Sequence, residues 1–121
     1  MISIEPAEIE RFLAEDDGKP VTMLNLVRFK PDGGRDRYQE YLKMAAPLLE
    51  RYGAELLYAG DGQNALAAES GQAWDAVGLV RYPDRRSFAS MIADPDYQRA
   101  DPIRTSALVE AVLQPTRSMF D

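Results

Sequence analysis

Residues 22–30, with the sequence TMLNLVRFK, form the most strand-like run in the chain. Side chains alternate between the two faces of a strand. One face therefore holds Met23, Asn25, Val27 and Phe29, and the other holds Leu24, Leu26 and Arg28. Both faces are mostly apolar, which is typical of a central strand that is covered on both sides. This run predicts a sheet with helices on one face and a second layer on the other.

The remaining elements follow from periodicity and turn residues. The expected order is a leading helix within residues 1–18, a strand over 20–30, a helix over 35–52, a strand over 54–60 continued by an extended piece over 65–70, a strand over 74–83, a helix capped by Asp84, two short helical pieces beginning at Asp94 and Asp101, and a strand over 111–120. This is a split βαββαβ pattern, so the sequence predicts an α+β ferredoxin-like fold with one antiparallel sheet in the order 4-1-3-2. Pro115 cannot donate to a strand ladder, which agrees with an edge position for the last strand.

The chain contains no cysteine and no histidine. These absences remove thiolate chemistry, the usual base of a catalytic triad and the commonest transition-metal ligands. No sequence feature indicates a metal site or a cofactor. Any reaction would have to use carboxylates, phenols, basic side chains, amides or the backbone.

A single domain over residues 1–121 is expected from the length. The formal net charge of −6 argues against nucleic acid and anionic membranes as partners. No apolar run approaches the roughly 20 residues that a membrane helix needs. The N-terminal residues lack the pattern of a secretory signal, so a cytoplasmic location is expected.

Several separated motifs carry a family resemblance. These are TMLNLVRFK, YQEYLKMAAPLLERYGAELLYAGDG, WDAVGLVRYPDRRSFASMIADPDYQ and ALVEAVLQPTR. Together they resemble the DUF1330 family, a group of small proteins of unknown function in the dimeric α/β-barrel superfamily. The resemblance covers the chain from about residue 20 onward and implies a homodimer in which two sheets pack face to face. Superfamily relatives include cofactor-independent monooxygenases and isomerases, but their chemistry differs, so the fold does not choose a reaction.

Asn25 is a polar residue on an otherwise apolar face of the predicted central strand, and its presence there needs an explanation. If Arg28 lies opposite Asp75 in an antiparallel pair, Asn25 faces Gly78, Val27 faces Ala76 and Phe29 faces Trp74. The small residues leave a hollow beside the amide, which is how a ligand pocket is often built. The alternative is that Asn25 satisfies a backbone group or a buried water in the core.

Five further residues are candidates for ligand binding. Arg28 and Asp75 could orient a ligand or form a cross-strand ion pair. Trp74 could form an aromatic wall or pack in the core. Tyr97 and Arg104 could close one end of a cavity or make ordinary contacts between elements.

Two functions remain open at this point. The first is a homodimer that holds a small apolar or aromatic molecule between sheet and helices, either as a binding protein or as a cofactor-independent enzyme. Asn25 with Arg28 or Arg104 would then stabilise an oxyanion, and a tyrosine or Asp75 would move protons. The second is a non-catalytic structural or protein-interaction dimer in which Asn25 has a structural role.

Overall fold

A computed structural model describes residues 2–120 of the protein. Its elements are α1 (Pro6–Ala14), β1 (Val21–Phe29), α2 (Gly34–Arg51), β2 (Glu55–Asp61), β3 (Ala76–Tyr82), α3 (Arg85–Ala93), α4 (Pro95–Ala107) and β4 (Leu108–Thr116). The strands form one antiparallel sheet in the order β2-β3-β1-β4. The predicted α+β ferredoxin-like topology is therefore confirmed, and Pro115 does lie on an edge strand.

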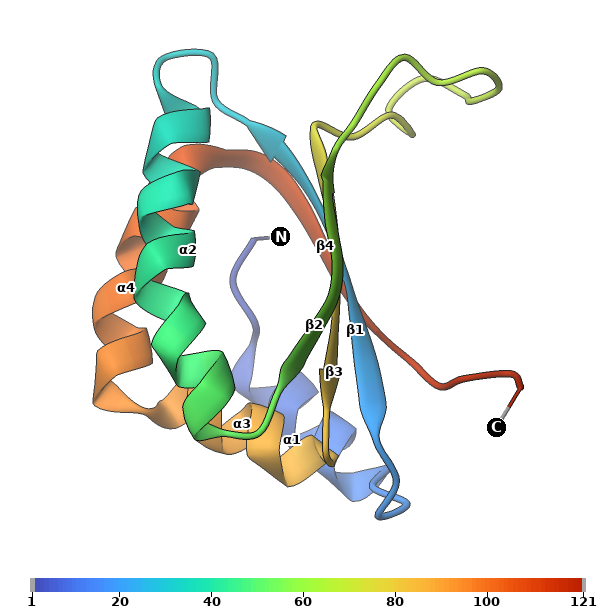
Figure 1. Ribbon diagram of the computed structural model, residues 1–121, viewed down its shortest axis with the longest axis vertical. Coiled ribbons are helices and arrows are strands. Elements are labelled where there is room, and N and C mark those ends of the chain that lie inside the picture. The colour runs from blue at the N-terminus through green and yellow to red at the C-terminus, as the bar shows by residue number, and fades with distance from the viewer. Residues whose placement is uncertain (1, 121) are drawn as a thin grey trace.

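The helices all lie on one side of the sheet or at its end (Figure 1). Helices α2 and α4 run alongside each other over the sheet, while α1 and α3 lie together near its lower end in this view. The N-terminal segment runs between the helices and the sheet. Among residues 2–120, no helix or strand lies on the opposite face of the sheet, and the loop after β2 and the C-terminal segment both extend on that side.

The alternation of β1 decides which of its side chains enter the core. Met23 and Val27 are 2% and 3% exposed, so the face that they share with Asn25 is the one that meets the helices. The main core cluster consists of Phe12, Val21, Met23, Leu48, Tyr82, Phe88, Met91 and Tyr97. Leu24 and Leu26 are half-buried on the uncovered face, as the alternation requires.

Helix α2 begins and ends within one residue of its predicted bounds. Gly33 precedes it with a φ of 85°, a left-handed conformation that favours glycine. Gly34 then starts the helix so close to α4 that a Cβ atom would lie 2.5 Å from the carbonyl oxygen of Ala107. The glycine pair thus allows α2 to pack tightly against the end of α4.

One prediction about the helices is wrong. The two expected short pieces after Asp94 form the single helix α4, with Pro102 in its interior. Asp94 caps this helix by accepting a hydrogen bond from the Asp96 amide at 2.8 Å. Pro102 removes only the hydrogen bond to the carbonyl of Gln98, and the helix continues because buried Ala100 and Ala107 hold both halves against the rest of the molecule.

Two predictions about the strands need correction. Residues 65–70 form no strand and lie in the loop between β2 and β3. The last strand begins at Leu108 rather than at residue 111 and follows α4 directly. Leu108 is 1% exposed, and the Lys30 amide donates to the Ala107 carbonyl at 2.9 Å, so burial and hydrogen bonding fix this junction.

Over residues 2–120, no helix combines the length and the apolar character needed to cross a membrane.

Candidate functional site

The predicted pairing of β1 with β3 places Asn25 beside a small residue. Asn25 lies opposite Gly78, and Val27 lies opposite Ala76, as expected. Ala59 of β2 in turn lies opposite Gly78, so three consecutive strands contribute Asn25, Gly78 and Ala59 side by side. The small residues leave space between this part of the sheet and α2.

This space is a cavity of about 510 Å³, which we call the large cavity. Its walls come from α2 on one side and from β1, β2 and β3 on the other. Apolar lining residues include Val27, Phe29, Tyr38, Ala45, Leu49 and Val80. Asn25 lines it at the inner end, and Arg35 and Asp61 form a 2.6 Å ion pair at another part of the wall.

A second space, which we call the middle cavity, has a volume of about 200 Å³. It shares Asn25, Tyr41, Tyr82 and Met91 with the large cavity, so these side chains form the boundary between the two spaces. Its lining is richer in polar groups: Asn25, Tyr41, Tyr97, Gln98, Asp101 and Arg104. The hydroxyl oxygens of Tyr41 and Tyr97 lie 3.0 Å apart and share a hydrogen bond.

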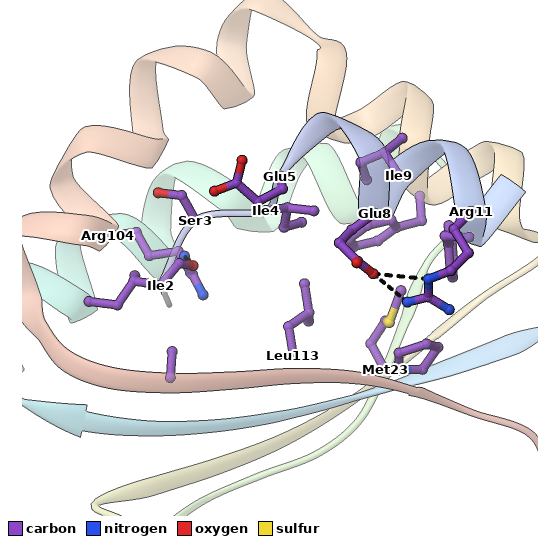
Figure 2. A pocket seen from close by; sticks show the side chains of 14 residues that line it. Ile2, Ser3, Ile4, Glu5, Glu8, Ile9, Arg11, Met23, Arg104 and Leu113 are labelled. Carbon is purple, nitrogen blue, oxygen red and sulfur yellow. Dashed lines mark hydrogen bonds and ion pairs between the residues drawn. The ribbon is translucent and has the colours of Figure 1, made fainter.

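The N-terminal segment closes the far side of the middle cavity. Ser3, Ile4 and Arg104 line both this space and a third one of about 240 Å³, the N-terminal cavity. Figure 2 shows Arg104 of α4 beside Ile2 and Ser3, with Leu113 and Met23 below them on the sheet. Arg104 Nη1 donates to the Ile2 carbonyl at 2.9 Å. The three cavities therefore follow one another through the layer between helices and sheet.

The amide of Asn25 is only weakly engaged by the protein. Its Nδ2 donates to the Met23 carbonyl at 3.4 Å, which is long for a hydrogen bond between neutral groups. Within residues 2–120, no other hydrogen bond involves this side chain. The amide can therefore form hydrogen bonds with a molecule in either adjoining cavity.

Burial controls the ionisation of the tyrosines around the cavities. Burial raises the pKa of Tyr38 to about 12, and the nearby Tyr41 adds to the effect. Burial and the neighbouring Tyr97 hydroxyl raise the pKa of Tyr41 well above its usual value. Burial also raises the pKa of Tyr97, against the opposing influence of the Tyr41 hydrogen bond and of Arg104. All three phenols are protonated at neutral pH and can donate hydrogen bonds.

Three predicted site residues lie away from these cavities, namely Arg28, Trp74 and Asp75. Arg28 projects from the face opposite to Asn25 and stacks over the ring of Trp74, with its Cζ atom 4.0 Å from the ring centroid. Arg28 also donates to the carbonyls of Gly71, at 2.9 Å, and of Ala73. Trp74 lines a separate hollow beside the start of β4. The Arg28 and Trp74 pair attaches the loop between β2 and β3 to the sheet.

The expected ion pair between Arg28 and Asp75 is wrong. Arg28 pairs with Glu110, its cross-strand neighbour on β4, at 3.1 Å. The Asp75 carboxylate instead accepts a hydrogen bond from the Phe29 amide at 2.9 Å. The central strand β1 has a neighbour on each side, so Arg28 can pair with a residue of β3 or of β4. It pairs with β4, because Asp75 lies just before β3 and its carboxylate is used to cap the end of β1.

The structure also brings Asp101, which sequence reasoning did not single out, together with the two candidates Tyr97 and Arg104. Tyr97, Asp101 and Arg104 follow one another at i, i+4 and i+7 on α4, and all three line the middle cavity. This helical spacing could have revealed from the sequence that the three side chains share one face. It becomes visible only if residues 95–107 are predicted as a single helix that contains Pro102. Tyr38 and Tyr41 of α2 pack against buried core residues, and both also line the large cavity. Among residues 2–120, no group of three or more acidic side chains is arranged to hold a metal ion.

The fold and these cavities define a small ferredoxin-like α+β protein with internal space between its helices and its sheet. The family model described as "Domain of unknown function (DUF1330)" matches residues 33–114, and the chain belongs to this family. None of the curated proteins matches the chain.

Solved structures confirm the relationship at the level of the fold. A protein of unknown function from Rhodopseudomonas palustris is 29% identical, with 99% of this chain and 98% of that chain covered and a TM-score of 0.90. A dimeric ferredoxin-like protein of unknown function from Jannaschia sp. is 14% identical, with 82% and 99% covered and a TM-score of 0.65. A provisionally assigned antibiotic biosynthesis monooxygenase from Bacteroides thetaiotaomicron is 19% identical, with 84% and 91% covered and a TM-score of 0.60.

Proposed function

We propose that the protein binds a small, largely apolar molecule in the large cavity between α2 and the sheet. The observation that carries this proposal is the cavity itself, whose volume of about 510 Å³ lies within the usual range for small-molecule sites. Its lining is mostly apolar, and among its few polar groups Asn25 stands at the boundary with the middle cavity. This combination of apolar walls and few polar groups is typical of a site that orients one kind of ligand.

The same groups would support chemistry without a cofactor. An amide donor and two neutral phenols near a bound carbonyl compound can stabilise negative charge that develops on its oxygen. Asp101 is the carboxylate that lines the middle cavity and could accept a proton. This arrangement suits proton transfer next to a carbonyl group, and we place a possible enzymatic activity in this class.

We also propose that the protein is a homodimer that uses the uncovered face of its sheet. Leu24 and Leu26 of β1 lie beside Leu79 and Val77 of β3 on this face, and no helix covers them. A continuous apolar sheet surface of this kind is typical of a protein interface. The description of the Jannaschia protein as dimeric supports this proposal.

Native mass spectrometry of freshly purified protein tests the binding proposal through Asn25. The wild type is expected to carry a small molecule, and Asn25→Ala is expected to lose at least half of it while remaining folded. Asn64→Ala, which removes an amide from the exposed loop, is the matched control and should retain the molecule.

The competing structural role of Asn25 predicts a different result. An Asn25→Ala variant that is destabilised by about 2 kcal/mol and retains the same bound mass as the wild type would contradict the proposal. Urea denaturation of the same samples supplies the stability measurement.

A further inference from the structure

Arg104 is a buried cation without an acidic partner. Arg104 is 8% exposed, and it is the one charged residue that is buried within residues 2–120. None of the ion pairs in this part of the chain includes it, although the Asp101 side chain lines the same cavity. A buried charge is normally paired, because the surrounding protein cannot replace the water that it has lost.

The guanidinium group has one edge free for a ligand. Nη1 donates to the Ile2 carbonyl, while Nε and Nη2 make no hydrogen bond within residues 2–120. Within residues 2–120, Nε of Arg37 is the one fully buried side-chain nitrogen that has no hydrogen-bond partner. Because Nε and Nη2 of Arg104 also have no partner there, these two atoms are not fully buried. Arg104 lines both the middle cavity and the N-terminal cavity, so a ligand in this space can reach the Nε and Nη2 edge. This edge has the geometry that binds the two oxygens of a carboxylate.

The middle cavity offers further donors to the same anion. Tyr41 and Tyr97 line it with their hydroxyl groups 3.0 Å apart, and Asn25 stands where it opens into the large cavity. A molecule with an acidic end near Arg104 could extend past Asn25 into apolar space. Arg104 is the one buried cation within residues 2–120, and Asp101 lines the same cavity, so an anion with one charge is favoured over a dianion such as a phosphate ester.

We infer that the ligand is an aromatic or branched apolar carboxylic acid, with its carboxylate on Arg104 and its apolar part in the large cavity. This inference rests on the proposed function and adds the chemical class of the ligand. Arg104 is the residue that recognises the charge.

Matched acids and amides test this assignment by isothermal titration calorimetry at neutral pH. The probes are benzoate, 3-phenylpropanoate and indole-3-acetate, each compared with its neutral carboxamide. The wild type is expected to bind at least one acid ten times more tightly than the matching amide. Arg104→Met should weaken binding of that acid at least tenfold and leave binding of the amide unchanged, whereas Arg104→Lys should fall between these values.

Two controls separate a charge effect from a folding effect. Arg99→Met removes an exposed arginine from the same helix and should bind the acid like the wild type. In thermal unfolding, Arg104→Met without ligand should show a single cooperative transition, which establishes that the variant is folded. The acid should raise the melting temperature of the wild type more than that of Arg104→Met.

Equal affinity of the wild type for acid and amide, or wild-type affinity for the acid in Arg104→Met, would overturn the inference and leave the proposed cavity site intact. If no acid and no amide binds the wild type, both the inference and the proposed function are contradicted.

Discussion

Asn25 shows how far residue-level prediction reaches in this protein. Strand alternation predicted which residues share its face, and the register that was assumed by placing Arg28 opposite Asp75 predicted its neighbour Gly78, which the structure confirms. The partners of Arg28 and Asp75 could not be predicted in the same way. They depend on where β4 and the loop before β3 come to lie, and the two-strand pattern contains no information about either.

The buried tyrosines give a prediction about alkaline pH. In the unfolded chain a phenol ionises near its ordinary pKa of about 10, whereas the pKa of Tyr38 in the folded protein is about 12. The stabilising effect of Tyr38 is therefore complete below pH 10 and is lost as the pH rises toward 12, because only the unfolded state releases the proton in this window. Tyr38 alone should reduce the free energy of unfolding by about 2 kcal/mol by pH 12.

Tyr38→Phe isolates this contribution, since no hydrogen bond of the Tyr38 hydroxyl is present within residues 2–120. Urea denaturation at pH 9 and pH 11.5 should show a smaller alkaline loss of stability in Tyr38→Phe than in the wild type. Equal losses in the two proteins would show that Tyr38 ionises normally in the folded state.

Individual elements were predictable where one physical signal was strong and unopposed. Helix α2 begins and ends within one residue of its predicted bounds, and Asp84 does cap α3 by accepting a hydrogen bond from the Ser87 amide at 2.8 Å. The α4 prediction failed because a proline after an aspartate is also the pattern of a helix start, and here tertiary packing outweighs the local pattern at Pro102. This failure hid the alignment of Tyr97, Asp101 and Arg104, and with it the polar lining of the middle cavity.

For the whole molecule, the uncovered sheet face predicts self-association. Leu26→Glu would place a charge among the apolar side chains of that face, and a buried unpaired charge strongly disfavours an interface. Light scattering at micromolar concentration should give a dimer for the wild type and a monomer for Leu26→Glu.

The matched control adds a charge to the other side of the molecule. Met44→Glu changes an exposed apolar residue of α2 and should leave the dimer unchanged. A monomeric wild type, or a Leu26→Glu variant that remains a dimer, would rule out this interface.

The large cavity is tested most directly by filling it. Ala59 is exposed, lines the cavity and lies opposite Gly78, so Ala59→Phe should occupy the space without disturbing the core. The measurement is the fluorescence of the neutral apolar probe N-phenyl-1-naphthylamine on titration with the protein, with Ala65→Phe in the exposed loop as the control. We predict that the wild type and Ala65→Phe bind the probe with the same affinity and that Ala59→Phe, with unchanged circular dichroism, binds it at least ten times more weakly. Equal binding by a folded Ala59→Phe would contradict a ligand site between α2 and the sheet.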